Sequence, residues 1–334
     1  MGLAEMVDAP VLLAGDIDRG GVFAQLYGTI ALLEEQERDR VKGTIVNKFR
    51  GDRAILEPGI RILEDLCKVP VVGVVPYLHF DIDDEDSLTE RFSRSKRGLI
   101  DLVVIRLPRI SNFSDFTPFE HYANVSLRYV ERFEELGQPD MIFLPGTKST
   151  IADLIWLRES GLETAIKKAA SSGIPVFGIC GGFQMLGESI SDPEHVENID
   201  ITEINGMGLL NTRTVFDKSK VQTQTEGTFF GIGGVLSELN GMNYTGYEIH
   251  MGQSQISKTV INNQNIYGTY IHGIFDAPGI SDSIIKALCK RKEVPVDFLE
   301  HYDINIHKNL QYDLLADAVR QNLDMRFVYQ ILNE

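Results

Sequence analysis

Residues 174–186 read IPVFGICGGFQML, an apolar run that leads into a cysteine flanked by glycines and then into a helix-like segment. The pattern predicts a buried strand that turns sharply into a helix at Cys180. Such a turn lifts the sulfur out of the sheet to a helix N-terminus, where the helix dipole favours the thiolate. Flanking glycines tolerate the strained backbone of such an elbow. The segment therefore indicates a nucleophilic cysteine; the other interpretation is a buried structural cysteine beside a glycine-rich turn.

An upstream segment supplies candidate oxyanion donors. Residues 141–150 read MIFLPGTKST, which predicts a buried strand, a glycine-containing loop and a helix that begins near Thr150. In an acyl-transfer site, one donor is the amide that follows the nucleophile, here Gly181. The loop would supply the other donor from Gly146 or Thr147.

A downstream segment supplies a candidate base. Residues 265–275 read NIYGTYIHGIF, an alternating strand pattern that ends at His272 beside a glycine. A histidine that meets a cysteine elbow is the usual pairing for nucleophilic catalysis, whereas a lone histidine at a strand end is often only a structural one. We therefore expect His272 to move protons for Cys180.

These three segments, in this order, resemble those of class I, or triad-type, glutamine amidotransferases. The motif GYEIHMG at 246–252 narrows the resemblance to the cobyric and cobyrinic acid branch of these enzymes. Three more motifs are similar to those of the cobyric acid synthase family. They are VLLAGDIDRGGVF at 11–23, VNKFRGD at 46–52 and LPRISNFSDF at 107–116. The similarity extends over essentially the whole chain.

The resemblance implies an α/β fold in four parts. Residues 1–80 would form part of a P-loop-type, dethiobiotin-synthetase-like domain with a parallel sheet, and residues 81–98 a linker. Residues 99–280 would form a flavodoxin-like class I glutamine amidotransferase domain, and residues 281–334 a small C-terminal helical extension. The alternation of short apolar runs with helical patterns agrees with parallel α/β organisation.

The resemblance also implies the chemistry. Cys180 would attack the side-chain amide of glutamine, His272 would shuttle protons, and the ammonia released would amidate carboxylates of a corrinoid substrate. This step needs no cofactor and no metal. Relatives outside this branch carry a glutamate two residues beyond the histidine, but Ile274 stands there in this chain. A Cys–His pair, oriented by some other acceptor, is the expected arrangement. Glu248 and His250 either assist it or brace the site.

In the first domain, the resemblance implies activation of the corrinoid carboxylate by ATP and Mg²⁺. Asp16 and Asp18 follow a predicted buried strand, where a carboxylate can reach Mg²⁺ or simply form a turn. Asn47 and Lys48 follow the next strand, at a position that resembles the base-recognition site of related nucleotide-binding folds. In the LPRISNFSDF motif, polar residues that include Asp115 face the cleft between domains or stabilise a loop.

The sequence contains no Gly-Lys pair, so the phosphate loop of the family is absent. The opening residues resemble mid-domain sequence. We therefore expect the chain to correspond to roughly the C-terminal two thirds of a cobyric acid synthase. By itself it should be incompetent for ATP-dependent synthesis. Synthetase activity would require that a missing N-terminal segment be supplied in trans.

Composition sets further limits. The chain has 334 residues, is 43% hydrophobic and carries a net charge of −16, which argues against nucleic acid or an anionic membrane as partner. No apolar run reaches the approximately 18 residues of a membrane span, and no signal peptide is recognisable. We expect a cytoplasmic protein. The other two cysteines, Cys67 and Cys289, lie in helix-like segments and are expected to be packing residues.

Two alternatives remain open from the sequence. Cobyrinic acid a,c-diamide synthase shares the two-domain plan but amidates other carboxylates. A non-catalytic scaffold that carries an amidotransferase-like module is the second alternative. The segments at 16–21 and 108–112 favour cobyric acid synthase over the first alternative. Alkylation of Cys180 by a glutamine-analogue electrophile would distinguish the second.

Overall fold

The computed structural model describes residues 1–82, 98–197, 200–256, 258–296 and 304–333. The chain divides into two compact units, one formed by residues 1–82 together with 306–334, and the other by residues 83–305. The acidic stretch that we expected to act as a linker falls mostly on residues 83–97, outside the described residues. Within the described part of the chain, no helix combines the length and the apolar character needed to cross a bilayer.

The first unit is built on a three-stranded parallel sheet in the order β1-β2-β3. Its strands and helices are α1 (Gly2–Met6), β1 (Val11–Asp16), α2 (Val22–Leu32), α3 (Glu35–Arg38), β2 (Val41–Phe49), α4 (Arg53–Cys67) and β3 (Val71–Pro76). The helix α4 begins where the Asp52 side chain accepts a hydrogen bond from the Ala54 amide, a standard N-cap. Apolar residues of α2, α4 and the strands form one core, which confirms the expected parallel α/β pattern.

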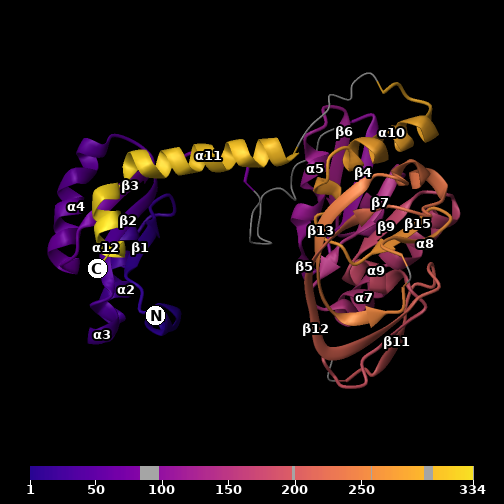
Figure 1. Cartoon of the computed structure of the whole chain (residues 1–334), viewed down its shortest axis with the longest axis horizontal. Helices are drawn as coiled ribbons and strands as arrows, with labels where there is room; N and C mark the ends of the chain where they lie inside the picture. The colour runs from indigo at the N-terminus through magenta and orange to yellow at the C-terminus, as the bar shows by residue number, and fades with distance from the viewer. Residues whose placement is uncertain (83–97, 198–199, 257, 297–303, 334) are drawn as a thin grey trace. The chain divides into compact units, whose positions relative to one another are not determined.

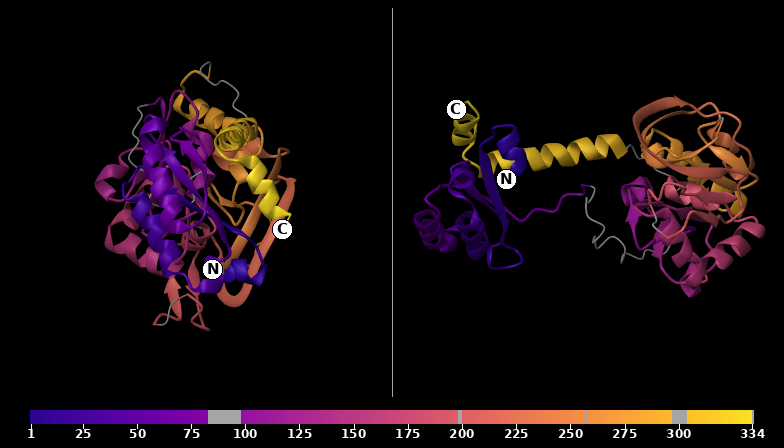
Figure 2. Two further views of the ribbon diagram at one scale, coloured as in Figure 1. Left: turned by 90° about the vertical axis from the view of Figure 1, so that its left-hand side faces the viewer. Right: turned by 90° about the horizontal axis from the view of Figure 1, so that it is seen from below.

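Two C-terminal helices complete this unit: α11 (Ile304–Asn322) and α12 (Met325–Leu332). The turn between them pairs with β3, because the amide of Asp324 donates to the carbonyl of Val72 at 2.8 Å and Leu323 bridges to Gly73. Figure 1 shows α12, in yellow, beside the indigo strands of this unit. The right-hand view of Figure 2, from below, shows α12 beside the same strands.

The second unit contains a six-stranded, mostly parallel sheet in the order β14-β15-β9-β7-β4-β6, in which only β14 is antiparallel to its neighbour. Its strands are β4 (Ile100–Ile105), β6 (Val125–Val130), β7 (Met141–Leu144), β9 (Val176–Ile179), β14 (Ile261–Asn263) and β15 (Ile266–Thr269). The central strands β4, β7 and β9 are apolar and almost entirely buried, as strands covered on both faces must be.

Helices and a second sheet surround the six strands. The helices are α5 (Thr117–Glu120), α6 (Phe133–Leu136), α7 (Thr150–Glu159), α8 (Leu162–Ser171), α9 (Gly181–Leu186) and α10 (Ile280–Lys292), with 3-10 turns η2 (Phe113–Phe116), η3 (Gly234–Leu239) and η4 (Ile274–Asp276). The second sheet has the order β11-β10-β12-β13, with β10 (Ser189–Ser191), β11 (Glu203–Asn205), β12 (Arg213–Thr228) and β13 (Asn243–Ser254). A two-stranded pair joins β5 (Ile110–Ser111) to β8 (Gly146–Thr147). The α/β fold class expected from the sequence is confirmed.

The expected C-terminal segment of residues 281–334 is divided by its packing. The helix α10 buries Ile280, Ile284 and Leu288 in the core of the second unit. Residues from 306 onward belong to the first unit. The segment is therefore divided between the two units and is not one separate extension.

The two cysteines expected to be packing residues are free and buried, and burial raises the pKa of both Cys67 and Cys289. Neither has the environment of a reactive thiol.

Candidate active site

Cys180 occupies the sharp turn between β9 and α9. Its φ of +50° and ψ of −110° lie outside the regions that side chains ordinarily adopt, so the backbone is strained at the residue expected to be the nucleophile. Gly182 permits this turn, because a Cβ at its position would lie 2.1 Å from the carbonyl oxygen of Leu144. The strand–turn–helix elbow predicted from residues 174–186 is present.

His272 follows β15 and is held on both sides. Its backbone exchanges hydrogen bonds with that of Tyr247 in β13, and its ring stacks on the ring of Tyr247. The imidazole is almost completely buried. Its Nδ1 hydrogen bonds to Oδ2 of Asp115 at 2.8 Å, while Oδ1 of the same carboxylate accepts from the amide of Gly273 at 2.8 Å.

Asp115 is therefore the acceptor that the sequence left unnamed. It lies in η2, 157 residues before the histidine, and is buried like it. We expected this residue to face the cleft between domains or to stabilise a loop; instead, its carboxylate contacts His272. The LPRISNFSDF motif was the only signal in the sequence, because no local spacing relates Asp115 to His272.

The environment of His272 favours the imidazolium form. Burial by itself lowers the pKa, but the charge and hydrogen bond of Asp115, followed by the hydrogen bond and charge of Cys180, raise it to about 10. A carboxylate on Nδ1 also keeps a proton on that nitrogen, so that Nε2 is the nitrogen left to exchange a proton with the sulfur. The arrangement suits a thiolate–imidazolium pair.

The residues expected to stabilise the oxyanion lie around Cys180 and His272. A Cβ on Gly181 would lie 3.3 Å from the amide nitrogen of Thr147, and a Cβ on Gly146 would lie 3.0 Å from Cε1 of His272. The antiparallel pair β5–β8 fixes this loop. The structure thus brings Gly146, Thr147 and Gly181 next to the Cys–His pair.

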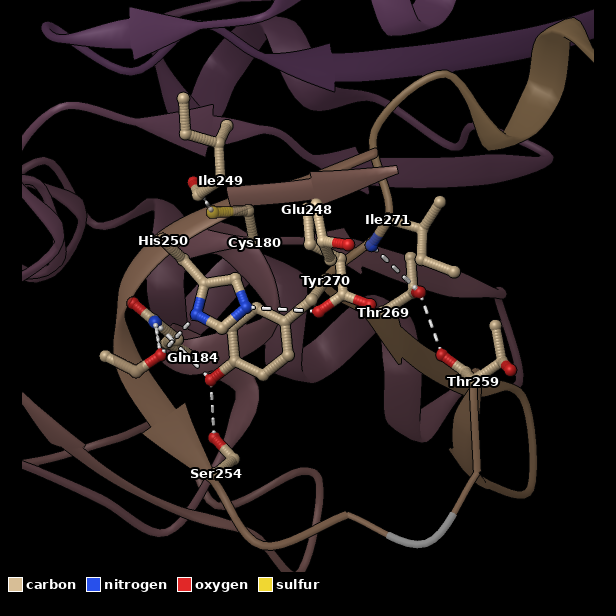
Figure 3. A network of polar contacts seen from close by, with 12 residues as sticks. Cys180, Gln184, Glu248, Ile249, His250, Ser254, Thr259, Thr269, Tyr270 and Ile271 are labelled. Atoms are coloured by element: carbon tan, nitrogen blue, oxygen red, sulfur yellow. Dashed lines mark hydrogen bonds and ion pairs between the residues drawn. The ribbon is translucent and has the colours of Figure 1, made fainter. Parts of the chain in front are cut away.

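Glu248 and His250 lie on the strand β13 beside the elbow (Figure 3). Nδ1 of His250 donates to the carbonyl of Gly252 at 2.7 Å, and Nε2 hydrogen bonds to Glu248 at 3.2 Å. The ring stacks on Tyr270 with 3.9 Å between centroids. Because protein groups occupy both ring nitrogens, this geometry favours the bracing role over direct assistance.

The braced strand also contacts the nucleophile. Sγ of Cys180 points to the carbonyl oxygen of Ile249 at 3.8 Å (Figure 3). Beneath it, the buried amide of Gln184 donates to the carbonyl of Gly252 and accepts from the hydroxyl of Thr150. These contacts hold α9, α7 and β13 in register around the sulfur.

A cavity of about 740 Å³ opens beside Cys180. It is lined by Thr147 and His250 among the residues above, by Arg109 of the LPRISNFSDF motif, which we expected to face the cleft between domains or to stabilise a loop, and by Lys148 of the MIFLPGTKST segment. Two further charged side chains of the lining, Glu197 and Lys220, were not singled out from the sequence. Arg109 is paired with the fully buried Asp153, with 2.9 Å between Nη1 and Oδ1. A space of this size admits an amino acid next to the sulfur.

The residues expected to serve the synthetase chemistry gather in the first unit, at the carboxyl ends of β1 and β2. Nζ of Lys48 lies 2.9 Å from Asp16, and the hydrogen bond from Lys48 lowers the pKa of that carboxyl group. Nε of Arg50 lies 2.7 Å from Asp18. The Asn47 side chain accepts from the amide of Lys48, which adopts a φ of +60°. All of these side chains are accessible to solvent, at the edge where α/β sheets bind ligands.

Comparison with known proteins agrees with this geometry. Residues 101–280 match the model of the CobB/CobQ-like glutamine amidotransferase domain. Cobyric acid synthase of Ruminiclostridium cellulolyticum is 52% identical over 100% of this chain and 69% of its own length. Cobyric acid synthase of Lachnoclostridium phytofermentans is also 52% identical, over 100% of this chain and 71% of its own length.

Among solved structures, PurLQS from Thermotoga maritima matches 57% of this chain and 99% of its own, with a TM-score of 0.43 and 18% identity. The CobB/CobQ-like domain match at residues 101–280 lies within the unit that holds Cys180 and His272. The two cobyric acid synthases match this chain from end to end. The chain belongs to the cobyric acid synthase family of cobalamin biosynthesis, and it is an enzyme of the glutamine amidotransferase kind.

Proposed function

We propose that the second unit hydrolyses glutamine to glutamate and ammonia at Cys180. The observation that carries this proposal is the hydrogen bond of His272 to the buried carboxylate of Asp115, together with the effect that Cys180, at the strained elbow, has on the pKa of the same imidazole. A buried imidazole with a carboxylate on one nitrogen and a thiol on the other is the arrangement that activates a sulfur nucleophile.

The steps follow from the residues. Sγ of Cys180 attacks the side-chain amide carbon, and the amides of Gly181 and of the Gly146–Thr147 loop stabilise the oxyanion that forms. Nε2 of His272 gives a proton to the leaving nitrogen, which departs as ammonia and leaves a thioester. Water, deprotonated by the same imidazole, then cleaves the thioester to glutamate and the free thiol. Asp115 positions the imidazole and stabilises its protonated form throughout.

We further propose that this ammonia amidates carboxylates of a corrinoid, namely the b, d, e and g side chains of adenosylcobyrinic acid a,c-diamide. In this reaction ATP and Mg²⁺ would activate each carboxylate as an acyl phosphate, from which ammonia displaces phosphate. The exposed carboxylates of Asp16 and Asp18, with Asn47 and Lys48 beside them, suit a magnesium–nucleotide complex in residue type. Because the sequence lacks a Gly-Lys phosphate loop, we expect the chain to need a segment supplied in trans for this step.

Glutamate release from glutamine by the purified chain tests the hydrolytic step. The Cys180→Ala variant should lose the activity, whereas Cys289→Ala, which removes a buried thiol from the same unit, should keep it. Equal rates in the wild type and Cys180→Ala would remove Cys180 from the mechanism.

Alkylation distinguishes the enzyme from a scaffold. A chloroketone analogue of glutamine should label Cys180 alone at neutral pH, because Cys180 lines the cavity, whereas the other two thiols do not line it and have raised pKa values. Absence of labelling would favour the scaffold alternative. Mass spectrometry of the corrinoid products would separate cobyric acid synthase from cobyrinic acid a,c-diamide synthase.

A further inference from the structure

The cavity beside Cys180 carries charges of both signs. Glu197 contributes a carboxylate, and Lys148 and Lys220 contribute ammonium groups. Within the described residues, neither lysine side chain has a carboxylate within ion-pair distance. A neutral amide would not require charged side chains in the cavity. A zwitterionic amino acid, in contrast, has an ammonium group that can face a carboxylate and a carboxylate that can face a lysine.

Glu197 is fixed at the wall of the cavity by the start of α7. Its Oε1 accepts from the amide of Thr150 and its Oε2 from the amide of Ile151, both at 2.7 Å. Burial raises the pKa of Glu197, and these two amides oppose that change. A carboxylate has about four lone-pair sites, so each oxygen retains capacity for a further donor. A cation in the cavity would compensate its burial.

An irregularity in β12 brings Lys220 to the cavity. Phe216 pairs with Gly252 and Val221 pairs with His250, so the residues 217–220 stand opposite Met251 alone. Bulges of this kind re-aim side chains and are frequent next to active sites. Met251 and Lys220 both line the cavity, and no described group balances the charge of this lysine.

We propose that this cavity selects its substrate by the amino-acid head: Glu197 binds the α-ammonium group of glutamine and Lys220 binds its α-carboxylate. The assignment rests on the glutaminase function proposed above and names two specificity-determining residues for it. Both lie in the same unit as Cys180 and line the cavity beside it.

Three amides test the assignment in steady-state hydrolysis. Glutamine carries both charged groups, glutaramate lacks the ammonium group, and 4-aminobutanamide lacks the carboxylate. Glu197→Gln should raise KM for glutamine and 4-aminobutanamide roughly 10- to 100-fold, the effect of losing a charge-assisted hydrogen bond, and leave glutaramate unchanged. Lys220→Met should raise KM for glutamine and glutaramate by a similar factor and leave 4-aminobutanamide unchanged.

The same loop and the same bulge provide matched controls. Glu194 and Lys218 pair with each other at 3.2 Å, are exposed and do not line the cavity. Glu194→Gln and Lys218→Met should leave all three KM values unchanged. Thermal melting of each variant separates loss of the α7 contacts of Glu197 from loss of binding.

Some outcomes would overturn the assignment. Equal effects of a variant on all three amides would show a structural role only, and unchanged KM values would show no role. Selective loss of carboxylate recognition in Lys148→Met but not in Lys220→Met would move that role to Lys148. If the wild type hydrolyses none of the amides, the proposed function fails separately. Calorimetric titration with glutamine then tests recognition alone, and binding that survives in both variants overturns it.

Discussion

Replacing Asp115 by asparagine tests the contact on which the proposed chemistry depends. The two carboxylate oxygens accept from two different donors, Nδ1 of His272 and the amide of Gly273. Asparagine has one carbonyl oxygen, so its NH₂ group must face one of these donors. If the oxygen remains on Gly273, the NH₂ group faces Nδ1, which must then accept. The ring proton then resides on Nε2, so that Nε2 can no longer accept a proton from the thiol of Cys180.

The magnitude follows from the pKa of His272. The rise from 6.5 to about 10 corresponds to roughly 5 kcal/mol in favour of the imidazolium form. Asp115 provides the two largest favourable contributions, and Cys180 provides the next two. Loss of an orienting carboxylate with its charge should therefore lower kcat for glutamine hydrolysis on the order of 10²- to 10⁴-fold. KM should change little, because Asp115 does not line the cavity.

The assay is glutamate release at saturating and limiting glutamine, with thermal melting to verify folding. Asp282→Asn is the matched control. Asp282 is also a buried carboxylate of this unit, but it accepts from the hydroxyl of Tyr122 and contacts neither His272 nor the cavity. A folded Asp115→Asn protein with kcat within about threefold of the wild type would refute the reasoning, since a triad member cannot be neutral to this change.

Three further outcomes are expected. Gly182→Ala should yield little folded protein or abolish hydrolysis, because its Cβ would lie 2.1 Å from a backbone oxygen of Leu144; wild-type expression and activity would contradict this. Ile284→Ala should lower the free energy of unfolding of the second unit by about 2–4 kcal/mol, measured by urea denaturation, since this fully buried side chain leaves a cavity; a change below about 1 kcal/mol would contradict it. The folded-state pKa of His272 is raised above its unfolded value, so its stabilising contribution is fully present below about pH 6.5 and is lost as the pH rises through about 10. The urea midpoint should fall more over this interval in the wild type than in Asp115→Asn, and equal slopes would argue against the ion pair.

The sequence by itself determined the local parts of this protein. The alternation of short apolar runs with helical patterns predicted parallel strands, and such strands are present, because buried parallel strands need continuous apolar sequence. The elbow at Cys180 was predicted from the glycines that flank it, because glycine tolerates the strained backbone of a sharp strand-to-helix turn. The family followed from motifs that lie in linear order along the chain.

Only the tertiary structure decided how distant groups combine. Asp115 and His272 are 157 residues apart, and nothing in either segment encodes their contact; it arises where η2 packs against the end of β15. Likewise, the helix α12 belongs to the first unit, where the turn before it pairs with β3, and not to a separate extension. The bulge that carries Lys220 to the cavity depends on the pairing of β12 with β13, and Glu197 meets the amides of α7 from a loop 46 residues away. Periodicity and turn chemistry act over a few residues, whereas the position of a titratable side chain beside another is fixed by packing across the whole unit.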